Sequence, residues 1–190
     1  MARWEPDARE RLVRAALDLF TEQGYDNTTV VQIAERAGVT KSTFFRHFPD
    51  KREVLVAGQD ALCQLLTDGI ASAPSTATPL EAVAAALDFA ASAFTPERRD
   101  FGPQVEAVIA ANTELQERDA LKRTSLASAI AEALQKRGVP DPTSSLAAEL
   151  AVLALQRTHA RWSDPTNQET FSELARQSLD ELRAASAALT

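Results

Sequence analysis

The sequence is poor in the residues from which enzymes and metal proteins build their sites. Cys63 is the only cysteine among 190 residues, and His47 and His159 are the only histidines. A single cysteine excludes an intramolecular disulfide and a cysteine metal cluster, as is usual in a reducing compartment. The six glycines are never closer than eleven positions, which excludes a glycine-rich phosphate loop. We therefore expect no catalytic residues, no metal and no cofactor.

Long hydrophobic runs are absent as well. The longest uninterrupted apolar runs, 82–87 and 150–155, have six residues each, whereas about 20 are needed to cross a bilayer. The first eleven residues are polar and charged and lack the apolar core of a secretory signal. These features predict a cytoplasmic protein with no membrane partner.

Strand-forming residues are few, and helix-forming residues are abundant. Aromatic residues make up 6% of the chain, with one tyrosine, whereas alanine supplies 36 of the 190 residues. We expect an all-α protein of one domain, or one domain with a small appendage. Apolar spacing and the positions of Gly, Pro and capping residues predict nine helices, at about 6–23, 29–37, 41–48, 50–71, 79–94, 101–111, 113–137, 144–163 and 168–188.

The charges are divided unevenly along the chain. Residues 1–56 carry nine Lys or Arg and nine Asp or Glu, so the whole net charge of −7 falls on residues 57–190, with eleven against eighteen. Within residues 39–52 the balance reverses, because four basic residues stand against Asp50 alone. This segment is a small basic island in an acidic protein.

The basic island overlaps a pattern typical of a helix-turn-helix. Ala34 stands where two short helices would cross too closely for a larger side chain, and Gly38 follows four positions later in the turn. A purely structural helical hairpin gives the same spacing, so the spacing alone leaves both interpretations open. The second helix favours the functional one, because it exposes donors of the kind that contact phosphates and base edges: Lys41, Ser42, Thr43, Arg46 and His47.

The run AALDLFTEQGYDNTTVVQIAERAGVTKSTFFRHFPDKREVL, residues 15–55, closely resembles the N-terminal DNA-binding region of the TetR family of transcriptional regulators. The resemblance covers roughly the first third of the chain. It implies a homodimeric repressor that binds a palindromic operator in double-stranded DNA and is controlled by a small-molecule effector held in a second, helical domain.

The resemblance also implies roles for individual residues. Lys41, Ser42 and Thr43 would face bases, joined by Gln32, and the following residues would contact phosphates. The family commonly has tyrosine where this chain has Phe45, so the phosphate bond of that hydroxyl is replaced by packing alone. The full set of expected DNA-binding residues is Thr29, Gln32, Thr40, Lys41, Ser42, Thr43, Phe45, Arg46, His47 and Lys51.

We expect residues 1–48 to form the DNA-binding domain and residues 49–190 the ligand-binding and dimerisation domain, with the helix at 50–71 as the link. Leucines of the last two helices would pair with their symmetry mates in a four-helix bundle. Phe89, Phe94, His159 and Trp162 are candidate pocket residues, although aromatic and histidine side chains at helical spacing are more often ordinary core.

Two other functions are open at this stage. A helical interaction protein that has lost DNA binding would keep the hairpin, but the basic set Lys41, Arg46, His47 and Lys51 argues against it. An enzyme would have to work without metal inside a helical cavity. Cys63 stands among leucines, where we expect an unreactive buried thiol.

Overall fold

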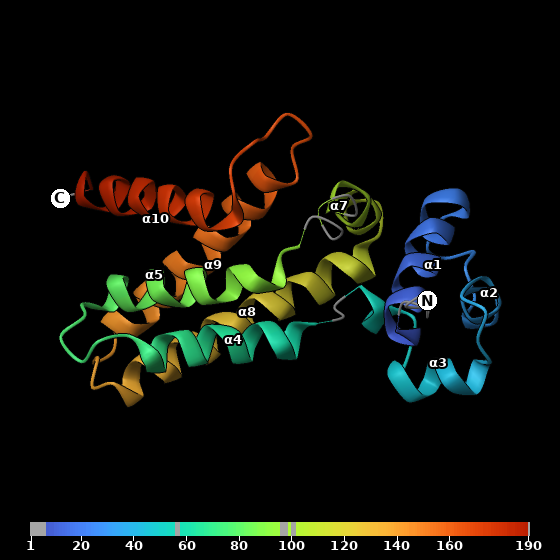
Figure 1. The fold of residues 1–190 in the computed structure, drawn as a ribbon, viewed down its shortest axis with the longest axis horizontal. Helices are drawn as coiled ribbons and strands as arrows, with labels where there is room; N and C mark the ends of the chain where they lie inside the picture. The colour runs from blue at the N-terminus through green and yellow to red at the C-terminus, as the bar shows by residue number, and fades with distance from the viewer. Residues whose placement is uncertain (1–6, 56–57, 96–98, 100–101, 190) are drawn as a thin grey trace, which may run out of the picture. The chain divides into compact units, whose positions relative to one another are not determined.

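The computed structural model describes residues 7–55, 58–95, 99 and 102–189. Within these residues the chain forms nine α-helices and two short 3₁₀ turns and has no strand, which confirms the predicted all-α fold (Figure 1). No helix of the described part is long and apolar enough to cross a membrane. The elements are α1 (Ala8–Gln23), α2 (Val30–Arg36), α3 (Lys41–His47), η1 (Arg52–Val54), α4 (Gln59–Ser72), α5 (Pro79–Ala90), η2 (Ala91–Ala93), α7 (Gly102–Ala110), α8 (Thr113–Lys136), α9 (Thr143–Trp162) and α10 (Phe171–Ala187).

The segment expected to form a single helix at 50–71 is divided, and that prediction is wrong. The Asp50 carboxylate accepts hydrogen bonds from the backbone N–H groups of Arg52 (2.8 Å) and Glu53 (3.2 Å), as expected of a capping residue. It begins only the short turn η1, however, and α4 starts anew after Gly58. Gly58 has φ +97°, a left-handed conformation that a continuous helix does not contain.

The chain divides into two compact units. One comprises residues up to 57 together with 103–119, and the other comprises 58–102 and 120–190. We call them the N-terminal unit and the C-terminal unit. The division differs from the predicted boundary after residue 48, because η1, α7 and the first seven residues of α8 pack with the N-terminal unit. Helix α8 is therefore the continuous helix that belongs to both.

The core of the N-terminal unit lies between α1 and the α2–α3 hairpin. Phe44 and Ile33 are completely buried, and Phe48 is 2% exposed. Ala34 is also buried, as expected where two helices cross closely, and Gly38 in the turn has φ +67°. Val108 and Leu115, from α7 and α8, complete this core.

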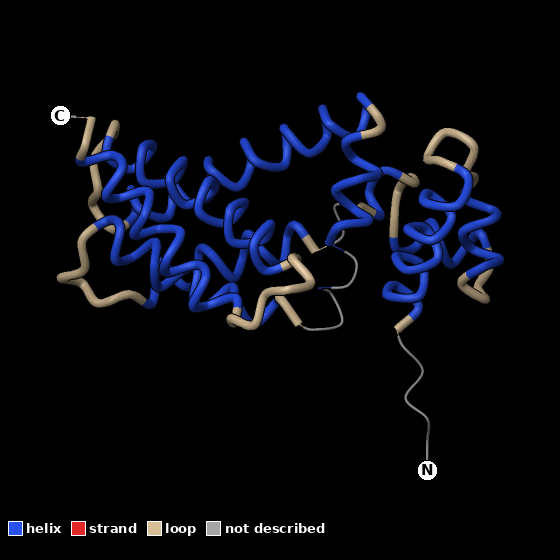
Figure 2. Tube along the Cα trace, turned by 90° about the horizontal axis from the view of Figure 1, so that it is seen from above, coloured by secondary structure: helices blue, strands red, loops and turns tan. Residues whose placement is uncertain are grey.

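Alanines form much of the core of the C-terminal unit. Helices α5 and α9 pack against each other, and each contributes buried alanines: Ala82, Ala86 and Ala90 on α5, and Ala147, Ala148, Ala151 and Ala154 on α9. Side chains this small let helix backbones approach closely. Larger side chains from α4, α8 and α10, such as Leu66, Leu134 and Leu174, fill the remaining space. Figure 2 shows the helical course of this unit.

The backbones of α4 and α5 approach closely at Gly69, which leads to a first prediction. A methyl group at this position would lie 2.5 Å from the Ala86 Cα, a backbone atom that no side-chain rotation can move. We expect Gly69→Ala to lower the free energy of unfolding by about 1–3 kcal/mol, as overpacking does, although alanine favours helix by about 1 kcal/mol over glycine. Urea denaturation measures this free energy of unfolding. The control Ala71→Ser, exposed on the same helix, should stay within about 0.5 kcal/mol of wild type.

Candidate DNA-binding surface

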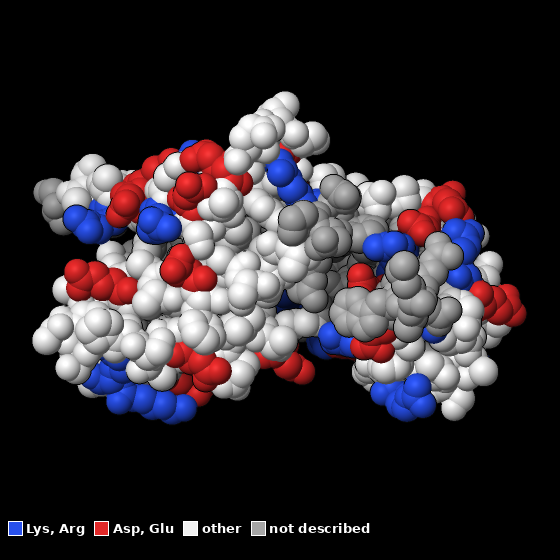
Figure 3. Space-filling model, viewed as in Figure 1, with Lys and Arg blue, Asp and Glu red and all other residues white. Residues whose placement is uncertain are grey.

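The second helix of the hairpin, α3, has one buried and one exposed face. Phe44 is in the core, whereas Lys41, Ser42, Phe45 and Arg46 are exposed. The side chain of Thr40 begins the helix by accepting a hydrogen bond from the Thr43 N–H at 3.1 Å. The structure thus brings most of the predicted α3 residues onto one open surface, and basic atoms lie over α3 in Figure 3.

Thr29 and Gln32 form a reciprocal cap at the start of α2. The Gln32 N–H donates to Thr29 Oγ1 at 3.3 Å, and Gln32 Oε1 accepts from the Thr29 N–H at 2.8 Å. A threonine followed three residues later by a glutamine is the sequence signature of such a capping box. Because the carbonyl oxygen of Gln32 is already bonded to the cap, the amide NH₂ is the group that Gln32 offers to an acceptor.

The exposed cations of α3 differ in how firmly they are held. The Lys41 Nζ lies 5.8 Å from the centre of the Phe45 ring one turn later. Phe45 is 48% exposed, so this predicted contact residue is open to a partner although it has no hydroxyl. Arg46 makes no ion pair with the residues that the structure describes. His47 is half-buried, and its Nε2 is buried without a partner in the described residues.

Lys51 has a structural task that the sequence pattern did not indicate. Its ammonium donates to the backbone carbonyls of Tyr25 at 2.8 Å and Thr28 at 3.1 Å, and it lies 4.1 Å from the centre of the Tyr25 ring. Burial raises the pKa of Tyr25 to about 12, so the ammonium faces a neutral phenol. Lys51 therefore ties the turn between α1 and α2 to the start of η1, and it retains one N–H for a phosphate.

Acidic side chains neutralise the other cations around η1. Arg52 pairs with Asp50 at 2.6 Å and with Glu114 at 2.9 Å, and Arg118 pairs with Glu53. The hydrogen bond from Arg52 is the main cause that holds the pKa of Asp50 below its usual value. These pairs join η1 to the first turns of α8, so that Arg52 and Arg118 each face a carboxylate.

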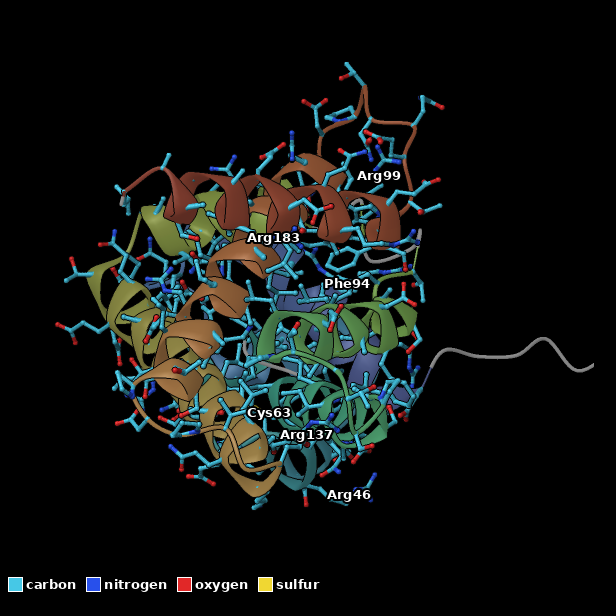
Figure 4. The ribbon with its side chains drawn as sticks, turned by 90° about the vertical axis from the view of Figure 1, so that its left-hand side faces the viewer. Arg46, Cys63, Phe94, Arg99, Arg137 and Arg183 are labelled. Atoms are coloured by element: carbon cyan, nitrogen blue, oxygen red, sulfur yellow. The ribbon has the colours of Figure 1, made fainter. Side chains whose placement is uncertain are left out.

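The candidate pocket residues separate into two places in the C-terminal unit. Phe94, His159 and Trp162 lie together, with ring centroids 5.8–6.2 Å apart. Phe94 stacks on Phe171 at 3.7 Å, beneath α10 (Figure 4). Phe89 is not part of this cluster: it lies at the surface and is 47% exposed. The aromatic cluster is close-packed, as expected of a core.

A shallow groove of about 560 Å³ lies elsewhere in the same unit, between α4 and α8. Its lining is polar and mixed in charge, with Asp68 and Glu132 beside Lys136 and Arg137, and it includes none of the predicted pocket residues. Cys63 is half-buried, and burial is the main cause that raises the pKa of its thiol. A raised pKa disfavours the reactive thiolate, as expected for an unreactive cysteine.

Sequence reasoning missed three functional or supporting groups. The role of Lys51 as a tie depends on carbonyls 23 and 26 residues away. Phe171 was not singled out, although its place directly after the capping Thr170 is a signal for a buried helix start. Arg9 was also missed; its guanidinium lies 5.5 Å above the Phe48 ring.

The contacts of Lys51 lead to a second prediction. Lys51→Met keeps the unbranched stem of the side chain, one atom shorter, but removes the ammonium and leaves two backbone carbonyls without their donor. Because hydrogen bonds to charged groups contribute about 1.5–3 kcal/mol, we expect the free energy of unfolding to fall by about 1–3 kcal/mol. Urea denaturation followed by circular dichroism measures it. The matched variant Lys41→Met, at an exposed site, should change it by less than about 0.5 kcal/mol, and equal effects of both would contradict the tie.

The comparisons with known proteins agree with this geometry. Residues 12–57 match the family model described as bacterial regulatory proteins, tetR family. The transcriptional regulator TcmR of Streptomyces glaucescens is 42% identical over 79 residues, 42% of this chain and 35% of TcmR. BetI of Rhizobium meliloti is 36% identical over 96 residues, 49% of this chain and 47% of BetI. The matched part thus spans less than half the length of these relatives.

Solved structures extend the likeness over nearly the whole chain. FadR of Thermus thermophilus, a TetR-family repressor in complex with lauroyl-CoA, covers 92% of both chains with a TM-score of 0.53 and 26% identity. A TetR-family regulator from Syntrophomonas wolfei covers 97% of both with a TM-score of 0.62 and, at 18% identity, shows the shared fold alone. Proteins of this family are DNA-binding regulators rather than enzymes. The N-terminal region of the chain, residues 12–57, thus matches the tetR family model, and the fold of the chain is similar to that of a solved TetR-family repressor.

Proposed function

We propose that this protein is a ligand-responsive repressor that binds a palindromic operator as a homodimer in the cytoplasm. The observation that carries the proposal is the exposed face of α3, which presents Lys41 and Arg46 while Phe44 anchors the opposite face in the core. A helix held in this way can enter the major groove of B-DNA, where its first residues reach base edges.

The cations of α3 would have different tasks on DNA. Lys41 is in the first turn, where a recognition helix contacts bases, and a lysine reads the acceptors O6 and N7 of guanine. Ser42 and Thr43 lie beside it and can bond to several bases. Arg46 and His47 are in the last turn, where phosphate contacts set the orientation of the helix.

Operator binding gives the third prediction. We expect Lys41→Ala to weaken binding to the selected operator by about 1–3 kcal/mol. The loss should come from reduced discrimination at one base position. Arg46→Ala should weaken binding to all DNA sequences alike. It should also make the negative slope of log K against log salt shallower by about 0.9 for each bound protomer. The control Arg36→Ala removes a cation already paired with Glu22 at 2.8 Å and should change neither quantity. Fluorescence anisotropy over a salt series measures both. Salt-independent binding, or none, would favour the helical interaction protein instead.

The proposed homodimer uses α9 more than α10. Leu146 is 62% exposed, Leu153 is 42% exposed, and Leu150 between them is half-buried, which gives one apolar stripe along α9. The leucines expected on α10 serve a different purpose, because Leu174 and Leu179 are buried in the chain's own core. The neighbouring end of α10 exposes mainly small side chains, including Ala184 and Ala185, against which a second copy can pack closely.

The fourth prediction concerns this stripe. Leu153→Glu would place a charge in the proposed interface and should convert the dimer to a monomer at micromolar concentration. Sedimentation equilibrium measures the mass. The control Leu121→Glu changes a leucine on α8 that is 60% exposed, and it should leave the dimer intact. A wild-type protein that is monomeric at this concentration would contradict the proposed homodimer.

We further propose that a small-molecule effector binds within the C-terminal unit. Support comes from the Thermus thermophilus relative, which binds lauroyl-CoA, so lauroyl-CoA is the first probe for thermal stabilisation of this chain. The effect would reach the DNA-binding residues through α8, since η1 is joined to its first turns by Arg52–Glu114 and Glu53–Arg118. By linkage, operator and effector must change each other's affinity by the same factor.

A further inference from the structure

The basic surface of the N-terminal unit extends beyond the recognition helix to a residue of α1. We infer that Arg9 is a further phosphate-binding residue, placed at the C-terminal end of α3 by the ring of Phe48. The inference rests on the proposed function, because it concerns the same protein–DNA interface.

The first argument is the position of Arg9. Its guanidinium carbon lies 5.5 Å from the centre of the Phe48 ring, and Phe48 is the residue that ends α3. Phe48 is 2% exposed and its ring is held by Phe44 at 5.7 Å, so the platform beneath the guanidinium is rigid. Arg9 itself is exposed. An arginine stacked on an aromatic ring keeps its N–H groups at the edge of its plane, where they can bind a phosphate with two hydrogen bonds.

The second argument comes from the charges around it. In this unit, Arg36, Arg52 and Arg118 each pair with a carboxylate, and the Lys51 ammonium is bonded to two carbonyls. In the described residues, Arg9, Lys41 and Arg46 are exposed and have no carboxylate partner. Arg11 also has no such partner, but it is half-buried, and one of its terminal nitrogens lies 3.7 Å from where a Cβ on Gly38 would stand.

The three exposed cations follow the length of the recognition helix. Lys41 is at its first residue, Arg46 is in its last turn, and Arg9 lies over the residue that ends it. A helix seated in the major groove meets the phosphate backbone at its ends, and phosphate contacts fix its register. Arg9 would therefore hold the C-terminal end of α3 against the backbone without reading any base.

If Arg9 only stabilised the fold, its substitution would have a different effect. A cation near the C-terminus of α3 also stabilises the helix through its dipole, and in that case Arg9 would affect stability and not the salt dependence of DNA binding. The variants Arg9→Gln and Arg9→Lys separate the two roles. Glutamine removes the charge, whereas lysine keeps the charge but loses the planar guanidinium.

The experiment measures binding of the full chain to its selected operator and to a scrambled duplex over a salt series, together with the thermal midpoint of each variant. We expect Arg9→Gln to make the negative slope of log K against log salt shallower by about 0.9 for each bound protomer on both duplexes. The base preference should be unchanged. Arg9→Lys should keep the wild-type slope. Arg36→Gln, which removes a paired cation, should keep it as well.

Two results would overturn the inference in distinguishable ways. A lower thermal midpoint with an unchanged slope for Arg9→Gln would mean that Arg9 only stabilises α3 through the helix dipole. The proposed function would then stand. Failure of the wild-type chain to bind any duplex would overturn the proposed function and this inference together.

Discussion

The burial of Phe44 is the interaction on which the proposed DNA-binding surface depends. Helix α3 has seven residues, and a helix of that length is not stable by itself in water. Its stability comes from Phe44, which is completely buried between α1 and α2, and from Phe48 at its end. Because these two rings anchor one side of the helix, the opposite side can carry exposed cations without having to contribute to folding.

Electrostatics around this core follow a simple division. Cations that serve the fold have partners inside the unit: Lys51 bonds to carbonyls, and Arg52 and Arg118 pair with carboxylates. Cations on α3 have no carboxylate partner within the described part of the chain. An unpaired surface cation contributes little to stability, but on DNA it releases counterions and adds to affinity. The distribution of partners, more than the number of charges, distinguishes the proposed binding surface of this acidic protein.

The C-terminal unit depends on close contact between helices that carry small side chains. Buried alanines on α5 and α9, and Gly69 on α4, bring the backbones together. Leu174 and Leu179 of α10 are buried in the chain's own core, so the surface proposed for a second copy is the apolar stripe on α9. The composition, rich in alanine, is thus explained by the packing of this unit as much as by helix propensity.

The sequence by itself determined the all-α fold, most helix ends, and the helix-turn-helix with the exposed Lys41, Ser42 and Arg46, whereas Thr43 and His47, also expected to be exposed, are half-buried. These features depend on neighbours within a few positions, for which spacing and capping chemistry are sufficient. Only the tertiary structure decided the break at Gly58, the tie of Lys51 to Tyr25 and Thr28, the placement of Arg9 over Phe48 and the separation of Phe89 from the other aromatic residues. Each of these depends on which distant segments meet, and local periodicity carries no information about that.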